Sequence, residues 1–242
     1  MKRFFLLVMS IVSVTYSAKS QQVIYDENAE VRSVGKFTGI EVSGTISLYL
    51  SQGNETGVAV SAGDAKYNSK IKTEVKNGVL QISVDAGMWN GFSWTNKKLK
   101  AYVSVVDLNR LEISGASYAT ISGNLQTNAL KVDISGASEV KGSIQVNNLN
   151  LDISGASVTR LTGTSKTLHI DASGACRVNG FDLKADNAKV DASGASHITL
   201  SVNKELSANA SGGSSIQYRG EPTVTNLNSS TGASIKRKNS GD

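Results

Sequence analysis

Apolar and polar residues alternate along most of the chain from residue 31 onward. In the second half the pattern is clearest in short segments such as 110–113, 131–134 and 150–153, where every second residue is apolar. An extended strand points successive side chains to opposite faces, so a period of two predicts strands with one buried face. These segments therefore predict an all-β fold.

A serine–glycine–alanine–serine phrase follows these segments in four identical and three altered copies. Its glycines are Gly115, Gly136, Gly155, Gly174, Gly194, Gly212 and Gly232, so successive copies are 18 to 21 residues apart. This spacing is too short for a pair of helices and is typical of one coil of a solenoid. Two further apolar stretches follow each phrase. We therefore expect three short strands per coil of about 20 residues, in a right-handed parallel β-helix.

The phrase itself predicts a structural corner. Glycine adopts backbone angles that a β-carbon forbids, which suits a tight bend. A catalytic serine on a hydrolase turn occurs once and needs a histidine partner. Here the phrase occurs seven times, and the chain has only His169 and His197. Cys176 replaces the last serine of one copy, and its simplest role is that of a small buried side chain rather than a reactive thiol.

The first third of the chain lacks the phrase but keeps the alternation in longer strands. Residues 76–79 read Lys-Asn-Gly-Val, a signal for a two-residue hairpin turn, which predicts antiparallel pairing. An open solenoid end exposes unpaired strand edges, so this region is expected to cap the solenoid or to supply its first coils. We expect a β region at 21–106, continuous with β-helix repeats at 107–235, and a tail at 236–242.

Charged residues form two columns on the predicted outer face. The acidic column is Glu112, Asp133, Asp152, Asp171 and Asp191, and the mostly basic column beside it is Arg110, Lys131, His169 and Lys189. Like charges stacked along a parallel sheet repel, and a neighbouring column of opposite sign offsets that repulsion. We interpret the acids as solvated pairs that fix the register. A cation or ligand site is the weaker alternative, so no metal and no cofactor is predicted.

Composition and targeting signals narrow the function classes. The chain has 242 residues, a net charge of +5 and one cysteine, which excludes an intrachain disulfide. Residues 1–20 resemble a secretory signal peptide, with two basic residues, an apolar run at 4–14 and small residues before Gln21. Its removal takes away Lys2, Arg3 and Lys19 and lowers the charge to +2 (5 − 3), so nucleic acid is not an expected partner. No later run suits a transmembrane helix, and we expect an exported protein in the periplasm, on the outer-membrane surface or secreted.

One aromatic cluster interrupts the pattern between two strands. Trp89, Phe92 and Trp94 lie within six residues and include both tryptophans of the chain. Exposed rings could stack on sugar faces or anchor a protein partner, whereas rings folded back would plug the end of the solenoid. These three residues are the candidate ligand-binding residues.

The segment 37–44, which reads Phe-Thr-Gly-Ile-Glu-Val-Ser-Gly, and the serial Ile-Ser-Gly-Ala-Ser coils resemble the bacterial family called putative auto-transporter adhesin, head GIN domain. The resemblance covers about residues 31–235. It implies a right-handed β-helix in the cell envelope or outside the cell, and it supplies no set of binding residues. No membrane-barrel segment follows the solenoid, so self-secretion through an attached translocator is not expected.

Together these features favour a non-catalytic, adhesin-like binding module that recognises a glycan or a protein of the envelope or host surface. A structural β-helix that associates with further copies of itself is the first alternative. A polysaccharide lyase or hydrolase is the second, because such enzymes also use β-helices. Its nearest catalytic candidates are Arg177, His197 and Asp171, but the coils vary too little in length to hold the long loops of a catalytic groove.

Overall fold

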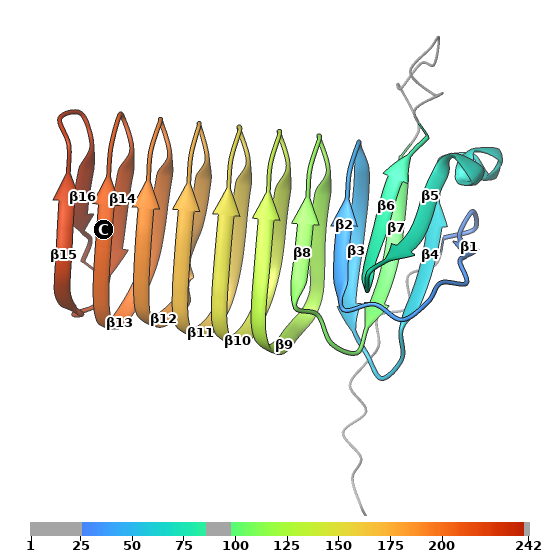
Figure 1. Ribbon diagram of the computed structural model, residues 1–242, viewed down its shortest axis with the longest axis horizontal. Coiled ribbons are helices and arrows are strands. Elements are labelled where there is room, and N and C mark those ends of the chain that lie inside the picture. Colours follow the sequence, from blue (N-terminus) through green and yellow to red (C-terminus); the bar gives the residue numbers. More distant parts are fainter. Residues whose placement is uncertain (1–25, 86–97, 240–242) are drawn as a thin grey trace, which may run out of the picture.

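The computed structural model describes residues 26–85 and 98–239, which form an elongated β-solenoid (Figure 1). Its central coils are five long strands, stacked in parallel with their neighbours. They are β9 (Tyr118–Ile134), β10 (Glu139–Ile153), β11 (Val158–Ala172), β12 (Arg177–Ala192) and β13 (His197–Ala210). Each runs from one serine–glycine corner to the next, so the expected parallel solenoid is confirmed.

The number of strands per coil differs from the expectation of three. Each central coil is one strand of 14 to 17 residues that descends one side, turns through a bend opposite the corner and rises along the other side. We call this turn the lower bend. The hydrogen bonds between neighbouring coils continue around the lower bend because the coils on either side bend at the same place. The register shifts locally, as between Lys141 and Ser143.

The solenoid begins before its first serine–glycine phrase. β2 (Gly39–Val42) pairs in parallel with β8 (Arg110–Ile113), and β3 (Ile46–Gln52) pairs in parallel with β9. The N-terminal region therefore supplies a coil to the same sheet as the repeats.

On the outer side of this coil two further strands pair in parallel with β2 and β3, and antiparallel strands follow them. β7 (Leu99–Val105) lies parallel to β3, and β4 (Gly57–Ser61) and β1 (Glu30–Val31) follow it in antiparallel order. The expected hairpin is confirmed: β5 (Ile71–Lys76) and β6 (Val79–Val84) pair through Asn77 and Gly78, whose φ angles are 51° and 76°. A 3-10 helix, η1 (Ala65–Lys70), connects β4 to β5.

The C-terminal end is simpler. β14 (Ser215–Arg219) and β15 (Thr223–Ser229) pair with the two halves of β13, and β16 (Ser234–Arg237) pairs with β14. β16 extends two residues into the segment 236–242 that the sequence suggested as a tail.

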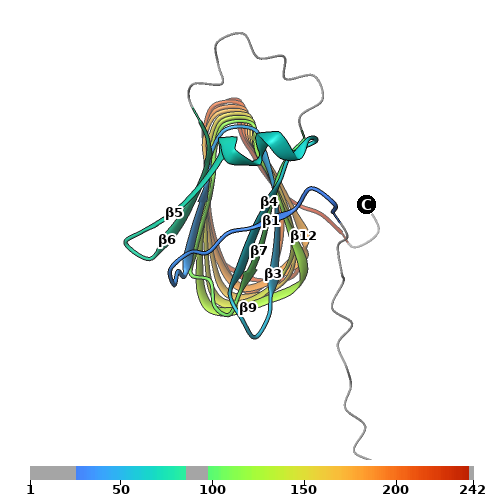
Figure 2. The same cartoon turned by 90° about the vertical axis from the view of Figure 1, so that its right-hand side faces the viewer.

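Seen from the N-terminal end (Figure 2), the chain rises on the side of β6, crosses the corner and descends on the side of β3 while it recedes, so the coil is right-handed.

The core consists of columns that contribute one inward side chain per coil. One column is Ile40, Leu111, Val132, Leu151, Ile170, Val190 and Ala208, each at most 1 % exposed. Stacking buries the inward side chains of the strands on both sides of the solenoid. This burial is the main force that holds the coils together. No helix among the described residues has the length and apolarity that crossing a membrane requires.

The corners stack as closely as the strands. The amide of Ala175 donates a 2.8 Å hydrogen bond to the carbonyl of Gly155 one coil earlier, and the first six phrases all make this bond to the preceding coil. The last residue of each of the first six phrases is buried, and Ser157 donates to the carbonyl of Ser154 within its own corner at 2.8 Å. The phrase backbone and its buried last residue therefore serve the bend itself, as expected for a structural corner.

Candidate functional site

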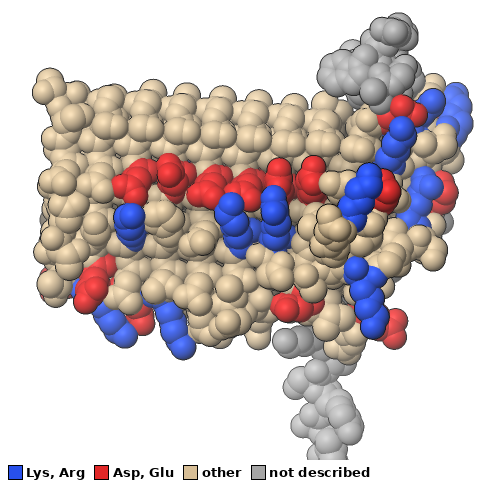
Figure 3. All heavy atoms as spheres, in the orientation of Figure 1, with Lys and Arg blue, Asp and Glu red and all other residues tan. Residues whose placement is uncertain are grey.

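The charge columns predicted from the sequence lie in register on the front face of the solenoid. Figure 3 shows a row of acidic side chains with basic side chains directly below it. The Nζ of Lys131 lies 2.9 Å from a carboxylate oxygen of Asp133 and 3.0 Å from one of Asp152 in the next coil. These two hydrogen bonds, that to Asp133 first, raise the pKa of Lys131. At this step Lys131 links two coils of the acidic column, in agreement with the register interpretation.

The same row gives no metal centre. Among the described residues, no group of three His, Cys, Asp or Glu side chains is arranged so that it could hold a metal ion. The acids form a line rather than a cage, because a strand column presents one carboxylate per coil. Calcium requires six to eight oxygen ligands around one point.

The structure does not bring the enzyme candidates together. Arg177 and His197 are register neighbours at the starts of β12 and β13, after the corner. Asp171 lies near the end of β11, before the corner, and therefore belongs to the opposite face. The pKa of His197 is lowered by burial and by the nearby Arg177. This arrangement lacks the adjacent acid and base that polysaccharide cleavage uses.

The aromatic residues Trp89, Phe92 and Trp94 belong to segment 86–97, outside the described residues. Their role as a binding loop stays a prediction.

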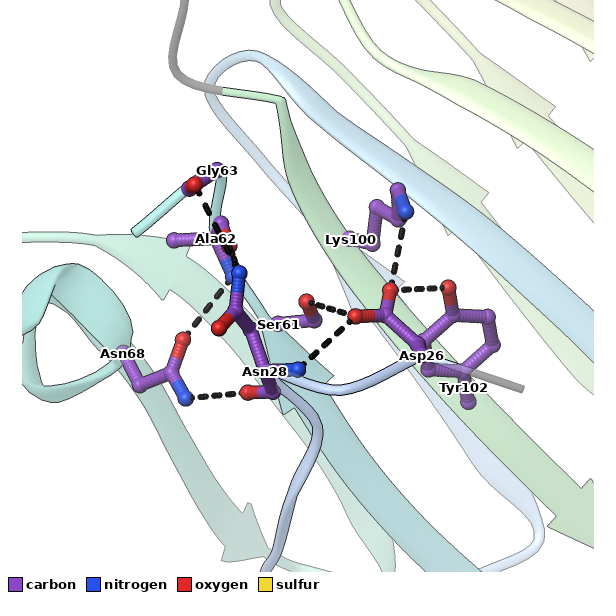
Figure 4. A network of polar contacts seen from close by, with 8 residues as sticks. All are labelled: Asp26, Asn28, Ser61, Ala62, Gly63, Asn68, Lys100 and Tyr102. Atoms are coloured by element: carbon purple, nitrogen blue, oxygen red, sulfur yellow. Dashed lines mark hydrogen bonds and ion pairs between the residues drawn. The ribbon is translucent and has the colours of Figure 1, made fainter. Parts of the chain in front are cut away.

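A polar network at the N-terminal end was not predicted from the sequence (Figure 4). The carboxylate of Asp26 accepts hydrogen bonds from Lys100 at 2.8 Å, from Tyr102 at 2.7 Å and from Ser61 at 2.9 Å. Lys100 first, and then Tyr102, hold the pKa of Asp26 far below its usual value. Nearby, Asn68 is buried and bonds the backbone of Asn28. These hydrogen bonds connect the first described residues to β4, η1 and β7, so the network holds this end of the fold together.

A hollow lies along the lower bend, and we call it the amide groove. It is an open groove of about 620 Å³ that crosses the coils of β9 to β13. One rim is a register row of exposed polar side chains, Gln126, Gln145, Thr164 and Lys184. The other rim is Asn128, Asn147, Lys166, Asp186 and Asn203. Between the rims lie Thr127, Val146 and Ser165, of which the last two are buried.

The rims of the amide groove carry donors and acceptors in a regular order. The side-chain amide of Asn147 donates to the Oδ1 of Asn128 at 2.7 Å, so amides of successive coils orient one another. This leaves further amide groups on the exposed rim side chains available to an incoming ligand. Since coils repeat about every 4.8 Å, the groove offers the same kind of group at each step along the axis.

The charge of the amide groove is positive near its middle. Lys204 forms a 2.9 Å ion pair with Asp186, and this pairing lowers the pKa of Asp186. Lys166 and Lys184 form no ion pair within the described part of the chain. The groove therefore presents two ammonium groups outside these ion pairs, beside its amides and hydroxyls.

The rim row carries a signal in the sequence that was not used. Gln126, Gln145 and Thr164 are 19 residues apart (145 − 126 and 164 − 145), the same spacing as that of the corner glycines Gly136, Gly155 and Gly174. Sequence reasoning followed the apolar positions there and did not align the polar ones.

Comparison with protein families settles the group to which the protein belongs. Residues 36–222 match the family described as putative auto-transporter adhesin, head GIN domain. The chain belongs to this family. The resemblance seen in the sequence is thereby confirmed, and a family of this description implies export. A comparison with curated protein sequences gives no match.

Solved structures share the fold. A putative adhesin from Bacteroides fragilis is 22 % identical with a TM-score of 0.80, over 87 % of this chain and 96 % of that one. A putative lipid binding protein from Parabacteroides distasonis is 21 % identical with a TM-score of 0.64, over 88 % and 98 %. A putative adhesin from Parabacteroides merdae is 15 % identical with a TM-score of 0.63, over 87 % and 95 %. At these identities the likeness concerns the fold.

Proposed function

We propose that the protein is a non-catalytic binding module of the cell envelope, or secreted from the cell, that holds an acidic glycan chain in the amide groove. The observation that carries this proposal is the groove itself, with amide and hydroxyl rims on successive coils and the ammonium groups of Lys166 and Lys184. Family membership supports the adhesin-like role.

A glycan suits this groove better than a folded protein does. A protein partner gains most of its affinity from buried apolar and aromatic anchors, and the described lining has only Val146 as a large apolar residue. A glycan instead presents hydroxyl groups at regular intervals, which amides can bind as both donors and acceptors. Carboxylate groups on the glycan would pair with Lys166 and Lys184, and this charge attraction also speeds association.

Binding without cleavage follows from the same lining. Glycosidases place two carboxyl groups on either side of the scissile bond. The only acidic side chain of the groove lining is Asp186, which is paired with Lys204. The groove can therefore hold a sugar chain but lacks the second carboxyl group for hydrolysis.

The test is calorimetric titration of the mature protein with polygalacturonate, hyaluronan and neutral dextran. We expect saturable binding of an acidic polymer that weakens as salt increases. The variant Lys166→Gln/Lys184→Gln should bind at least tenfold more weakly, on the order of 1.4 kcal/mol. The control Lys36→Gln/Lys141→Gln removes two exposed lysines elsewhere and should bind like the wild type.

Two further variants distinguish the amide groove from the aromatic loop as the binding site. The variant Gln126→Ala/Gln145→Ala tests the neutral rim, and Trp89→Ala/Phe92→Ala/Trp94→Ala tests the loop. Loss of binding in the loop variant alone would assign the site to the loop and overturn the amide groove as the site. Equal loss in both lysine pairs would indicate unspecific charge attraction, and no binding of any acidic polymer would overturn the proposal.

A further inference from the structure

The two ends of the solenoid are finished differently. At the N-terminal end, antiparallel strands β4 and β1, the helix η1 and the Asp26 network cover the first coil (Figure 2). At the C-terminal end, β15 pairs only with β13, and β16 pairs only with β14, within the described residues. The outer edges of both terminal strands thus carry backbone N–H and C=O groups that could pair with another strand.

The last coil also exposes part of the apolar core. Val224 and Leu227 of β15 are 43 % and 40 % exposed. Their register partners in the preceding coil, Leu206 and Ala208, are fully buried. Val224 and Leu227 therefore continue the inward columns, and they are exposed because the described chain places no further coil against them. Two exposed apolar side chains beside free strand edges suit an interaction surface.

The charges at this end are distributed unevenly. β15 contains no charged residue, whereas β16 carries Lys236 and Arg237 and is followed by Lys238. Arg237 forms a 2.7 Å ion pair with Glu221, and lysines on an edge strand discourage a second basic strand from pairing there. The edge of β15 accepts a basic neighbour without repulsion, and the edge of β16 does not.

We infer that two copies of this chain join through their C-terminal coils, with β15 of each copy pairing antiparallel with β16 of the other. A two-fold axis parallel to the strands produces this arrangement. It exchanges the front and rear faces and keeps each corner beside a corner and each lower bend beside a lower bend. Since β15 ends and β16 begins at the same corner, Ser229 of one copy lies level with Ser234 of the second copy.

The alternative two-fold axis, perpendicular to the sheet, fits less well. It would pair β16 with β16 and bring Lys236 and Lys238 close to their own copies. It would also place the narrow corner of one copy against the wider lower bend of the other (Figure 2). The favoured arrangement avoids both conflicts and buries Val224 and Leu227 of both copies in one continuous core.

The inferred assembly is a closed dimer and not a fibre. An interface in which the same surface serves both copies uses up that surface when two copies meet. The N-terminal ends remain at the outer tips, and the covering strands there offer no matching coil. This inference does not depend on any glycan in the amide groove.

The first experiment measures mass by sedimentation velocity from micromolar to hundreds of micromolar protein. We expect the mass to rise to twice that of the monomer. Leu227→Lys and Val224→Lys each place a charge in the interface but on an exposed position of the single copy, so both should fold by circular dichroism and remain monomeric. The control Val31→Lys, at an 82 % exposed position of the opposite end, should dimerise like the wild type. A monomeric wild type, or dimers in both charged variants, would overturn the inference.

The second experiment tests the arrangement, in a Cys176→Ser background. A mixture of the Ser229→Cys and Ser234→Cys variants should give a disulfide-linked heterodimer under mild oxidation. Asn226 is the middle residue of β15 and would meet its own copy only about the perpendicular axis. Rapid cross-linking of Asn226→Cys with itself, without the mixed product, would overturn the pairing of β15 with β16.

Discussion

Tyr102 donates a 2.7 Å hydrogen bond from its hydroxyl to the carboxylate of Asp26, 76 residues earlier in the chain. Together with Lys100 it fixes the first described residues to the covering strands. We predict that Asp26→Asn, which removes the charge, lowers the free energy of unfolding by about 2 kcal/mol, the scale of a hydrogen bond to a charged group. Urea denaturation measures this, and Glu27→Gln, at an exposed neighbouring position, is the control. Equal stability of the two variants would contradict the prediction.

The same network predicts a dependence of stability on pH. The pKa of Asp26 is lower in the folded protein than in the unfolded chain, chiefly because of Lys100 and then Tyr102. The unfolded chain therefore binds a proton first, so the stabilisation is complete above an unfolded pKa of about 3.9 and declines as the pH falls below it. Denaturation midpoints between about pH 6 and about pH 3 should fall less in Asp26→Asn than in the wild type. Parallel curves for the two proteins would rule out this role.

Two glycines with similar backbone conformations should differ in how much stability is lost when each is replaced by alanine. Gly174 and Gly123 have similar φ angles, 85° and 76°. A β-carbon at Gly174 would lie 2.6 Å from the carbonyl oxygen of Gly155, whereas one at Gly123 would meet nothing within 4 Å. Gly123→Ala should cost about 1 kcal/mol for the backbone alone. Gly174→Ala should cost about 3 kcal/mol because the clash between coils is added.

Thermal or urea denaturation of both glycine variants measures this difference. The comparison isolates the contact between coils, since the backbone conformation is nearly the same. Similar losses for Gly174→Ala and Gly123→Ala would show that the corners do not depend on close stacking.

Cys176 should behave as a structural side chain. Its thiol is buried and donates to the carbonyl of Ser173 at 2.9 Å, just as Ser196 donates to Ser193 at 2.8 Å in the next corner. Burial raises the pKa of the Cys176 thiol, so little thiolate is present at neutral pH. We predict that Cys176→Ser changes the unfolding free energy by less than about 1 kcal/mol.

Thiol labelling checks the same residue. Native Cys176 should react with a thiol reagent far more slowly than a cysteine introduced at the exposed position Ser69. Labelling at equal rates would mean that the corner opens readily and would contradict the interpretation of Cys176 as a buried structural side chain.

The repeated part of the fold was predictable because each coil repeats the same local information. Alternating residues, a glycine corner and a spacing of about 20 residues specify strand, turn and stacking independently at every coil. The lower bend was predicted less well. Gly123, Gly142 and Gly163, all with positive φ, recur near its start in β9, β10 and β11, but no fixed phrase surrounds them as it does the corner glycines.

The candidate site was less accessible from sequence for two physical reasons. Asp26 has no periodic signal, and its partners are 35 to 76 residues away, so only the folded chain brings them together. The amide groove depends on polar side chains at a bend, where exposure is set by the bend and not by alternation. Trp89, Phe92 and Trp94 are conspicuous in the sequence because they concentrate aromatic residues in a short segment. They lie outside the described residues.

Because each central coil contacts only the coils beside it, the length of this molecule can change in whole steps. Removing residues 139–157, one full coil from strand to corner, would join Ser138 to Val158, which already occupies the same register position as Glu139. Such a change shortens the molecule by about 4.8 Å and leaves the capped end and the open end as they were. Loss or gain of a repeat in the gene thus tunes the reach of the protein, whereas loss of a single residue turns a strand inside out.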